Sequence, residues 1–202
     1  MKKIILSLAI VFGLGVVQAS AQRVSFGVKA DANMSSFILS DLDGMESKIG
    51  FGANLGGFMK YDFCEHFAIQ PELLFNFRSS ELKGEGEKDN FHYWGMELPV
   101  YALSQWNTVD GGKIFAGVGP YVGLGLSAKM DRADIDVYEK FEDESFLRRF
   151  DFGFGALFGL ELSNRMQINA SYKIGVLNMM DEGRDYGKMF PHAFSLGVGY
   201  RF

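Results

Sequence analysis

The sequence has one cysteine, four prolines and three histidines among 202 residues. A single cysteine cannot form an internal disulfide, so Cys64 is predicted to be an ordinary turn residue. The formal charge of −5 comes without a basic patch, which argues against a nucleic-acid partner. The scarcity of histidine and cysteine also leaves few candidates for a catalytic or metal centre.

Long hydrophobic runs are absent beyond the amino-terminus, which predicts that the mature chain has no transmembrane helix. At the amino-terminus, Lys2 and Lys3 precede an uncharged apolar run at residues 4–17. The run is short of the roughly 20 residues that a spanning helix needs. Small residues Ala19 and Ala21 then form a cleavage motif, so we expect a signal peptide at 1–21 and one domain at 22–202.

Aromatic and glycine residues are abundant, and they alternate along the chain. Hydrophobic residues make up 48% and aromatic residues 15% of the sequence, with 25 glycines. A period of two is typical of strands whose two faces meet different surroundings. In the last eleven residues the large apolar side chains occupy every second position, at Phe194, Leu196, Val198, Tyr200 and Phe202.

Eight segments follow this alternation, at residues 23–33, 50–63, 66–78, 91–105, 113–128, 150–162, 166–177 and 192–202. Short turns and long polar links alternate between them, and their large-residue faces carry no charge. This pattern predicts an all-β fold, an eight-stranded antiparallel up-and-down transmembrane β-barrel in the cell outer membrane. The short turns would then be periplasmic and the links at 34–49, 79–90, 129–149 and 178–191 extracellular.

The main rival fold is a soluble lipocalin-like barrel, whose large apolar face would point inward around a ligand. Aromatic residues near both ends of the segments favour the membrane barrel, because they could form two interfacial girdles. Pro71 and Pro120 are awkward inside central strands, so we expect a bulge at each or a one-residue error of register.

The small-residue faces of the strands carry the charges. An eight-stranded barrel is just wide enough inside for side chains to fill it. Five basic and six acidic side chains nearly balance, which predicts a salt-bridge network that plugs the lumen. Its members are Lys29, Asp31, Lys60, Asp62, Glu72, Arg78, Glu97, Asp151, Glu161, Lys173 and Arg201.

Within this set Glu72 and Glu97 are expected at similar depth on adjacent strands, with Lys29 or Lys173 across from them. A carboxylate pair could instead be an acid–base dyad.

Four stretches resemble a known family. They read G-M-E-L-P-V-Y at 95–101, A-G-V-G-P-Y-V-G-L-G at 116–125, D-F-G-F-G-A-L-F-G-L-E at 151–161 and G-V-G-Y-R-F at 197–202. In these motifs the mature chain is similar to the outer-membrane β-barrel domain of PorT-like, porin-family proteins of Bacteroidota. The resemblance implies that the closing strand, with Tyr200 and Phe202, is read by the outer-membrane assembly machinery. One member type serves type IX secretion, but no residue singles out that role here.

The function expected from the sequence is non-enzymatic, with no cofactor. We expect a monomer with a structural or surface-interaction role, the lipid bilayer around it and a possible extracellular or secretion-system protein partner. A narrow channel, a secretion accessory and a lipid A-modifying or proteolytic enzyme remain alternatives. His92 and His192 would lie near the outer rim, but no recognisable catalytic spacing surrounds them. The acidic link at 129–149 could bind a cation, although no fixed ligand spacing appears.

Overall fold

The computed structural model describes residues 24–40, 46–47, 49–84, 87–130, 135–136, 149–178 and 188–202. The predicted signal peptide, with Ala19 and Ala21, lies outside the described residues. The strands are β1 (Val24–Ser40), β2 (Glu46–Ser47), β3 (Gly50–Cys64), β4 (Phe67–Gly84), β5 (Glu87–Asn107), β6 (Lys113–Met130), β7 (Ile135–Asp136), β8 (Phe150–Glu161), β9 (Met166–Gly175) and β10 (Lys188–Arg201).

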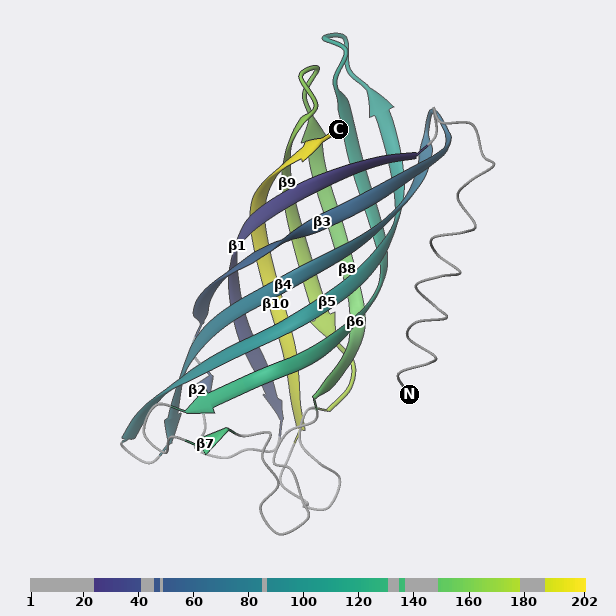
Figure 1. Cartoon of the computed structure of the whole chain (residues 1–202). Coiled ribbons are helices and arrows are strands. Elements are labelled where there is room, and N and C mark those ends of the chain that lie inside the picture. The colour runs from purple at the N-terminus through teal and green to yellow at the C-terminus, as the bar shows by residue number, and fades with distance from the viewer. Residues whose placement is uncertain are drawn as a thin grey trace, which may run out of the picture.

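Eight of these strands are long, and they close into the predicted antiparallel barrel (Figure 1). Each pairs with its neighbours in chain order, and β1 pairs with β10, so that Lys29 lies opposite Gly199. The two-residue strands β2 and β7 pair with β4 and β6. Among the described residues, no helix has the length and hydrophobicity needed to cross a membrane.

Several strands extend further than the side-chain alternation predicted. β1 continues to Ser40, and β4 and β5 run on until Gly84 pairs with Glu87. The predicted charged link at 79–90 is therefore largely a hairpin. Strand pairing uses backbone groups, so the ladder can continue beyond the residues whose side chains alternate between two environments.

The expected bulges at Pro71 and Pro120 are wrong. Pro71 pairs with Val100 and Pro120 with Phe154, and the register is the same on both sides of each proline. A proline removes one N–H donor but adds no residue, so the ladder loses a bond without shifting. The register shifts instead at Asp62/Cys64 and at Trp94/Gly95.

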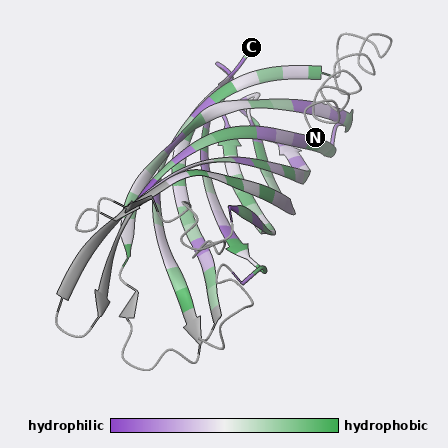
Figure 2. Cartoon of the chain, turned by 60° about the horizontal axis from the view of Figure 1, so that its bottom comes forward, coloured by the Kyte–Doolittle hydropathy of each residue, from purple (hydrophilic) through white to green (hydrophobic). Residues whose placement is uncertain are grey.

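Hydrophobic and hydrophilic residues alternate along the strands (Figure 2), and the exposed large side chains of the outer face are apolar. Val118 and Leu55 are 65% and 66% exposed, whereas inward residues such as Lys60 are buried. The large apolar side chains thus face outward, opposite to the lipocalin-like rival.

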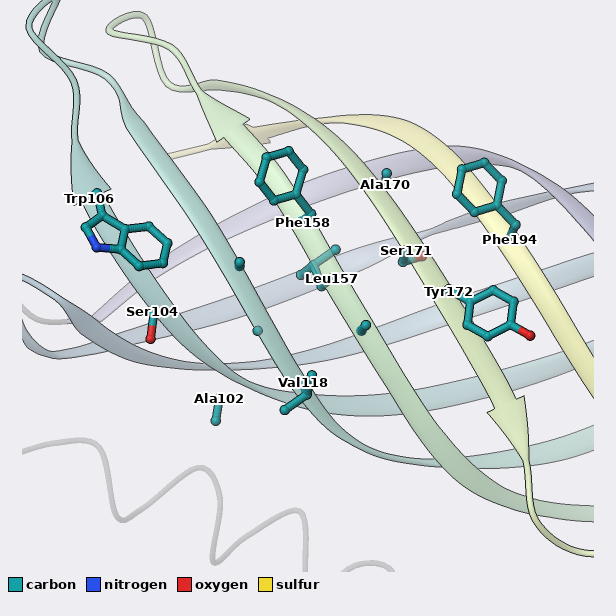
Figure 3. A pocket seen from close by; sticks show the side chains of 13 residues that line it. Ala102, Ser104, Trp106, Val118, Leu157, Phe158, Ala170, Ser171, Tyr172 and Phe194 are labelled. Atoms are coloured by element: carbon teal, nitrogen blue, oxygen red, sulfur yellow. The ribbon is translucent and has the colours of Figure 1, made fainter.

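A groove of about 610 Å³ on this face crosses β5, β6, β8 and β9. Its lining includes Ala116 and Ala156 and the aromatic side chains of Trp106, Phe158 and Phe194, the last of these on β10. Figure 3 shows the three aromatic side chains.

Aromatic side chains contact one another toward both ends of the strands. Phe63 lies between Tyr61 and Phe67 near the β3–β4 turn, with ring centroids 4.6 and 5.6 Å away. Toward the other end, the rings of Phe77 and Trp94 are 4.8 Å apart. These are positions where interfacial girdles were predicted.

Inside the barrel, glycines on one strand make room for rings from another. A Cβ atom on Gly159 would overlap the Phe115 ring, and one on Gly27 would overlap Phe58. Phe115 and Phe58 are both buried. The glycine-rich inner faces therefore allow large side chains to fill a narrow lumen.

Candidate functional site: the charged lumen

The first group of charges joins β1 to β4. Lys29 Nζ donates to Glu72 Oε2 at 3.1 Å and lies 3.5 Å from Asp31 Oδ2. Gln70 Nε2 donates to the other oxygen of Glu72 at 2.8 Å. Lys29 is level with Gly56 on the intervening strand β3, so no side chain there obstructs its reach to β4. One ammonium thus serves two buried carboxylates.

The second group is centred on Glu97. Its two carboxylate oxygens accept separately from Arg78 Nη2 on β4 and Lys173 Nζ on β9. Because β6 and β8 separate β5 from β9, the Glu97–Lys173 pair crosses the lumen. Nearby, the Tyr121 hydroxyl donates to Asp151 Oδ2 at 2.8 Å.

The third group lies near the short turns. Arg201 Nε is 3.0 Å from both oxygens of Glu161, and Arg201 Nη2 donates to Glu161 Oε1 at 2.5 Å. Gln167 Nε2 on the strand between them also donates to Glu161, at 2.8 Å. This group ties β8, β9 and β10 together inside the barrel.

Two further charges complete the short-turn end. Gln105 Nε2 donates to Asp62 Oδ1 at 2.6 Å. The ammonium of Lys60 lies over the Phe115 ring, 5.5 Å from its centroid. A cation over a ring face is attracted by the ring's quadrupole, which suits a side chain that is almost wholly buried.

All eleven predicted charges belong to inward-facing positions, but the structure distributes them over separate groups. Glu97 pairs with Leu74 in the ladder rather than with Glu72. The two glutamates lie at different levels and bind different cations. Their arrangement is that of buried ion pairs between strands, not of two carboxylates sharing a proton.

Tyr200 and Phe202, predicted as an assembly signal, lie exposed at the short-turn end, with ring centroids 5.7 Å apart. Phe202 N donates to Phe26 O at 2.8 Å. The last residue therefore extends the contact between β10 and β1 that closes the barrel.

The histidines do not converge. His66 lies in the exposed β3–β4 turn, and His192 lies beside the Tyr172 ring at 6.2 Å. The side chain of His92 is outside the described residues. No cluster of three or more His, Cys, Asp or Glu side chains in the described ranges could hold a metal ion. Most of the acidic link at 129–149 is not among those ranges.

The lumen residues predicted from the sequence were all charged, and the buried carboxamides were not among them. Asn33 Nδ2 donates to Asn54 Oδ1 at 2.7 Å, and Asn54 Nδ2 donates to Ser195 Oγ at 3.3 Å, which links three strands. Gln70 and Asn76 are equally buried. The period-two pattern could have identified these carboxamides, because each occupies the same alternating face as the charges.

Comparison with known proteins identifies one family and several solved structures of similar fold. The family model described as outer membrane protein beta-barrel domain matches residues 8–181. Among solved structures, OprG from Pseudomonas aeruginosa has a TM-score of 0.57 at 11% identity, covering 89% of this chain and 96% of that one. Neisserial surface protein A has a TM-score of 0.54 at 18% identity, covering 89% and 99%. No curated protein sequence matches significantly.

Proposed function

The chain belongs to the family of outer membrane protein beta-barrel domains, and on that premise we propose that it is a monomeric, non-enzymatic barrel with a structural or surface-interaction role. Its location is the outer membrane, and its apolar outer face lies in the lipid bilayer. In this role the long links at the loop end of the barrel contact the partner. We assign this end to the cell exterior.

One observation carries this proposal: ion pairs cross the lumen and fill it. Lys173 reaches Glu97 from the facing wall, and Lys29 reaches Glu72 over a third strand. A buried pair of this kind holds its strands together and leaves little room for a solute. Side chains that could contact a partner are then found mainly in the links between the long strands. The link at 129–149 is the longest and most charged of these.

The test replaces residues 137–148 in two ways. One variant has a short glycine–serine linker, and the other has an uncharged segment of the original length. Membrane-impermeant crosslinking on intact cells, followed by mass spectrometry, identifies partners of the wild-type barrel. We expect both variants to insert normally and to lose those partners. An unchanged partner set would contradict a role for this link.

Three alternatives have distinct tests. A channel would give stepwise conductance in planar bilayers. A secretion accessory, suggested by the resemblance to PorT-like proteins, would be crosslinked to periplasmic or membrane machinery through its short turns, for example at Glu65 or Asp110. An enzyme acting on lipid A would leave an altered lipid A profile that His192→Ala abolishes.

A further inference from the structure

Small side chains gather on one part of the lipid-facing surface. The strands β5, β6, β8 and β9 are neighbours in the sheet. Five outward positions on these strands hold small residues, namely Ala102, Ser104, Ala116, Ala156 and Ala170. All five line the groove of about 610 Å³ on the outer face.

Large side chains form the walls of this groove. In the ladder, Val118 lies between Ala102 and Ala156. Phe158 lies in the same way between Ala116 and Ala170. Val118 is 65% and Phe158 is 58% exposed, so both protrude from the barrel beside the small residues of the floor.

The form of the groove suits a thin occupant. A second barrel has a convex surface and would meet Val118 and Phe158 before it reached the alanines. A flexible hydrocarbon chain can instead lie between these walls, on the floor. Trp106 stands at one end of the groove and Phe194 at the other (Figure 3).

The groove extends from the short-turn end of the barrel toward its middle. Trp106 is one residue from the end of β5, whereas Phe194 is eight residues from Phe202 at the same end of the barrel. A residue in a strand tilted by about 40° adds about 2.5 Å of depth. Phe194 therefore lies roughly 18 Å deeper than Trp106. One leaflet of the hydrocarbon core is about 15 Å thick, so the groove extends through the leaflet on the short-turn side.

The hydrogen-bond donors of the floor are concentrated at the short-turn end. Ser104 and Trp106 occupy successive outward positions on β5 and offer a hydroxyl and an indole N–H. Tryptophan is typical of the interface between lipid headgroups and hydrocarbon. The floor beyond these residues is apolar, and none of the described residues that line the groove is charged. A molecule with ester groups at one end of a long hydrocarbon tail has the same polarity.

We propose that the groove binds one acyl chain of a glycerophospholipid from the leaflet on the short-turn side, with the lipid esters beside Ser104 and Trp106. This is the periplasmic leaflet, since the loop end is assigned to the cell exterior. The location of the barrel in the outer membrane supplies the lipid. The proposal concerns the lipid-facing surface, so it can fail or hold independently of the role assigned to the links.

Native mass spectrometry measures the retention of this lipid. The full-length mature barrel is folded into phosphatidylethanolamine–phosphatidylglycerol vesicles and extracted in a mild detergent. We expect the wild-type barrel to retain one phospholipid. Ala156→Phe fills the floor and should reduce retention at least fivefold. Ala53→Phe is the matched control, because Ala53 is an outward residue of β3 that does not line the groove. It should retain the lipid as the wild type does.

Photocrosslinking determines the orientation of the chain. Two phosphatidylethanolamine probes carry a diazirine either next to the ester or near the end of the acyl chain, and each is irradiated after extraction. We expect the first probe to label the peptide that contains Trp106, and the second to label peptides of β8 or β9 around Ala156 or Tyr172. Label spread evenly around the barrel, or the reverse order, would overturn the proposal.

Heat-modifiable gel migration identifies the folded fraction of each variant. If Ala156→Phe does not fold, Ala170→Leu fills the same floor from β9 and should also lose the lipid. A wild-type barrel that retains no lipid would overturn the proposal, as would folded groove variants that retain it or an equal loss in Ala53→Phe. A dimer that Ala156→Phe disperses would assign the groove to a second copy of the chain, and the proposal would then be wrong.

Discussion

Replacing Glu97 by leucine should destabilise the barrel strongly, because its carboxylate is shared by two cations. Removing one partner of a buried ion pair typically costs about 3–5 kcal/mol of unfolding free energy. The cost should come mainly from Lys173, whose side chain is 3% exposed, rather than from Arg78, at 15%. Lys173 has little access to water once Glu97 is gone, so we expect the loss of unfolding free energy to lie within this range of about 3–5 kcal/mol.

Equilibrium urea unfolding in lipid vesicles provides the assay, with the fluorescence of Trp94 and Trp106 as reporters on the outer face. The double variant Glu97→Leu/Lys173→Met removes the carboxylate and the more deeply buried of its two cations, and it should recover most of the lost stability. A single-variant cost within about 0.5 kcal/mol, the range of ordinary surface substitutions, would refute the reasoning. A double variant no more stable than Glu97→Leu would show that Lys173 is not the stranded charge.

Three other predictions use different parts of the barrel. Val118→Arg, on the lipid-facing surface, should cost roughly 2–4 kcal/mol of unfolding free energy in vesicles, whereas Val109→Arg in the exposed β5–β6 turn should cost almost nothing; equal costs would place Val118 outside the bilayer. Gly159→Ala should lower the urea midpoint because its Cβ overlaps the Phe115 ring, and Phe115→Leu should partly restore it. Deleting Phe202 should reduce the heat-modifiable barrel recovered from outer membranes relative to total protein, since its N–H bonds across the β1–β10 seam; unchanged recovery would argue against a role in assembly.

The period-two pattern was sufficient to predict the closed barrel and the facing of its strands. Facing depends only on whether a residue is odd or even within its strand, and a lipid-facing surface tolerates no charge. The ends of the strands were harder to predict, because pairing of β4 and β5 continues where side chains no longer need to alternate. The effect of Pro71 and Pro120 was also misjudged, since a missing N–H weakens a ladder without changing its register.

Partners inside the lumen could not be predicted from alternation alone. Lys29 and Glu72 are separated by 43 residues and by the intervening strand β3, and their contact depends on the stagger between strands. Glu97 and Lys173 are 76 residues apart and meet only because the sheet closes. Facing is a local property of a strand, whereas these contacts depend on the register of every strand between them.

The sequence motif at 95–101 predicted the location of the protein but not its activity, because its residues determine facing and lumen contacts. Its alternate residues Glu97, Pro99 and Tyr101 are all buried on the inner wall. Glu97 binds cations from two other strands, and Tyr101 belongs to the buried apolar cluster with Ala68, Leu103, Phe115 and Leu157. The motif therefore specifies how the lumen is filled. Residues that determine a partner would have to lie where the lumen does not constrain them, in the links between the long strands.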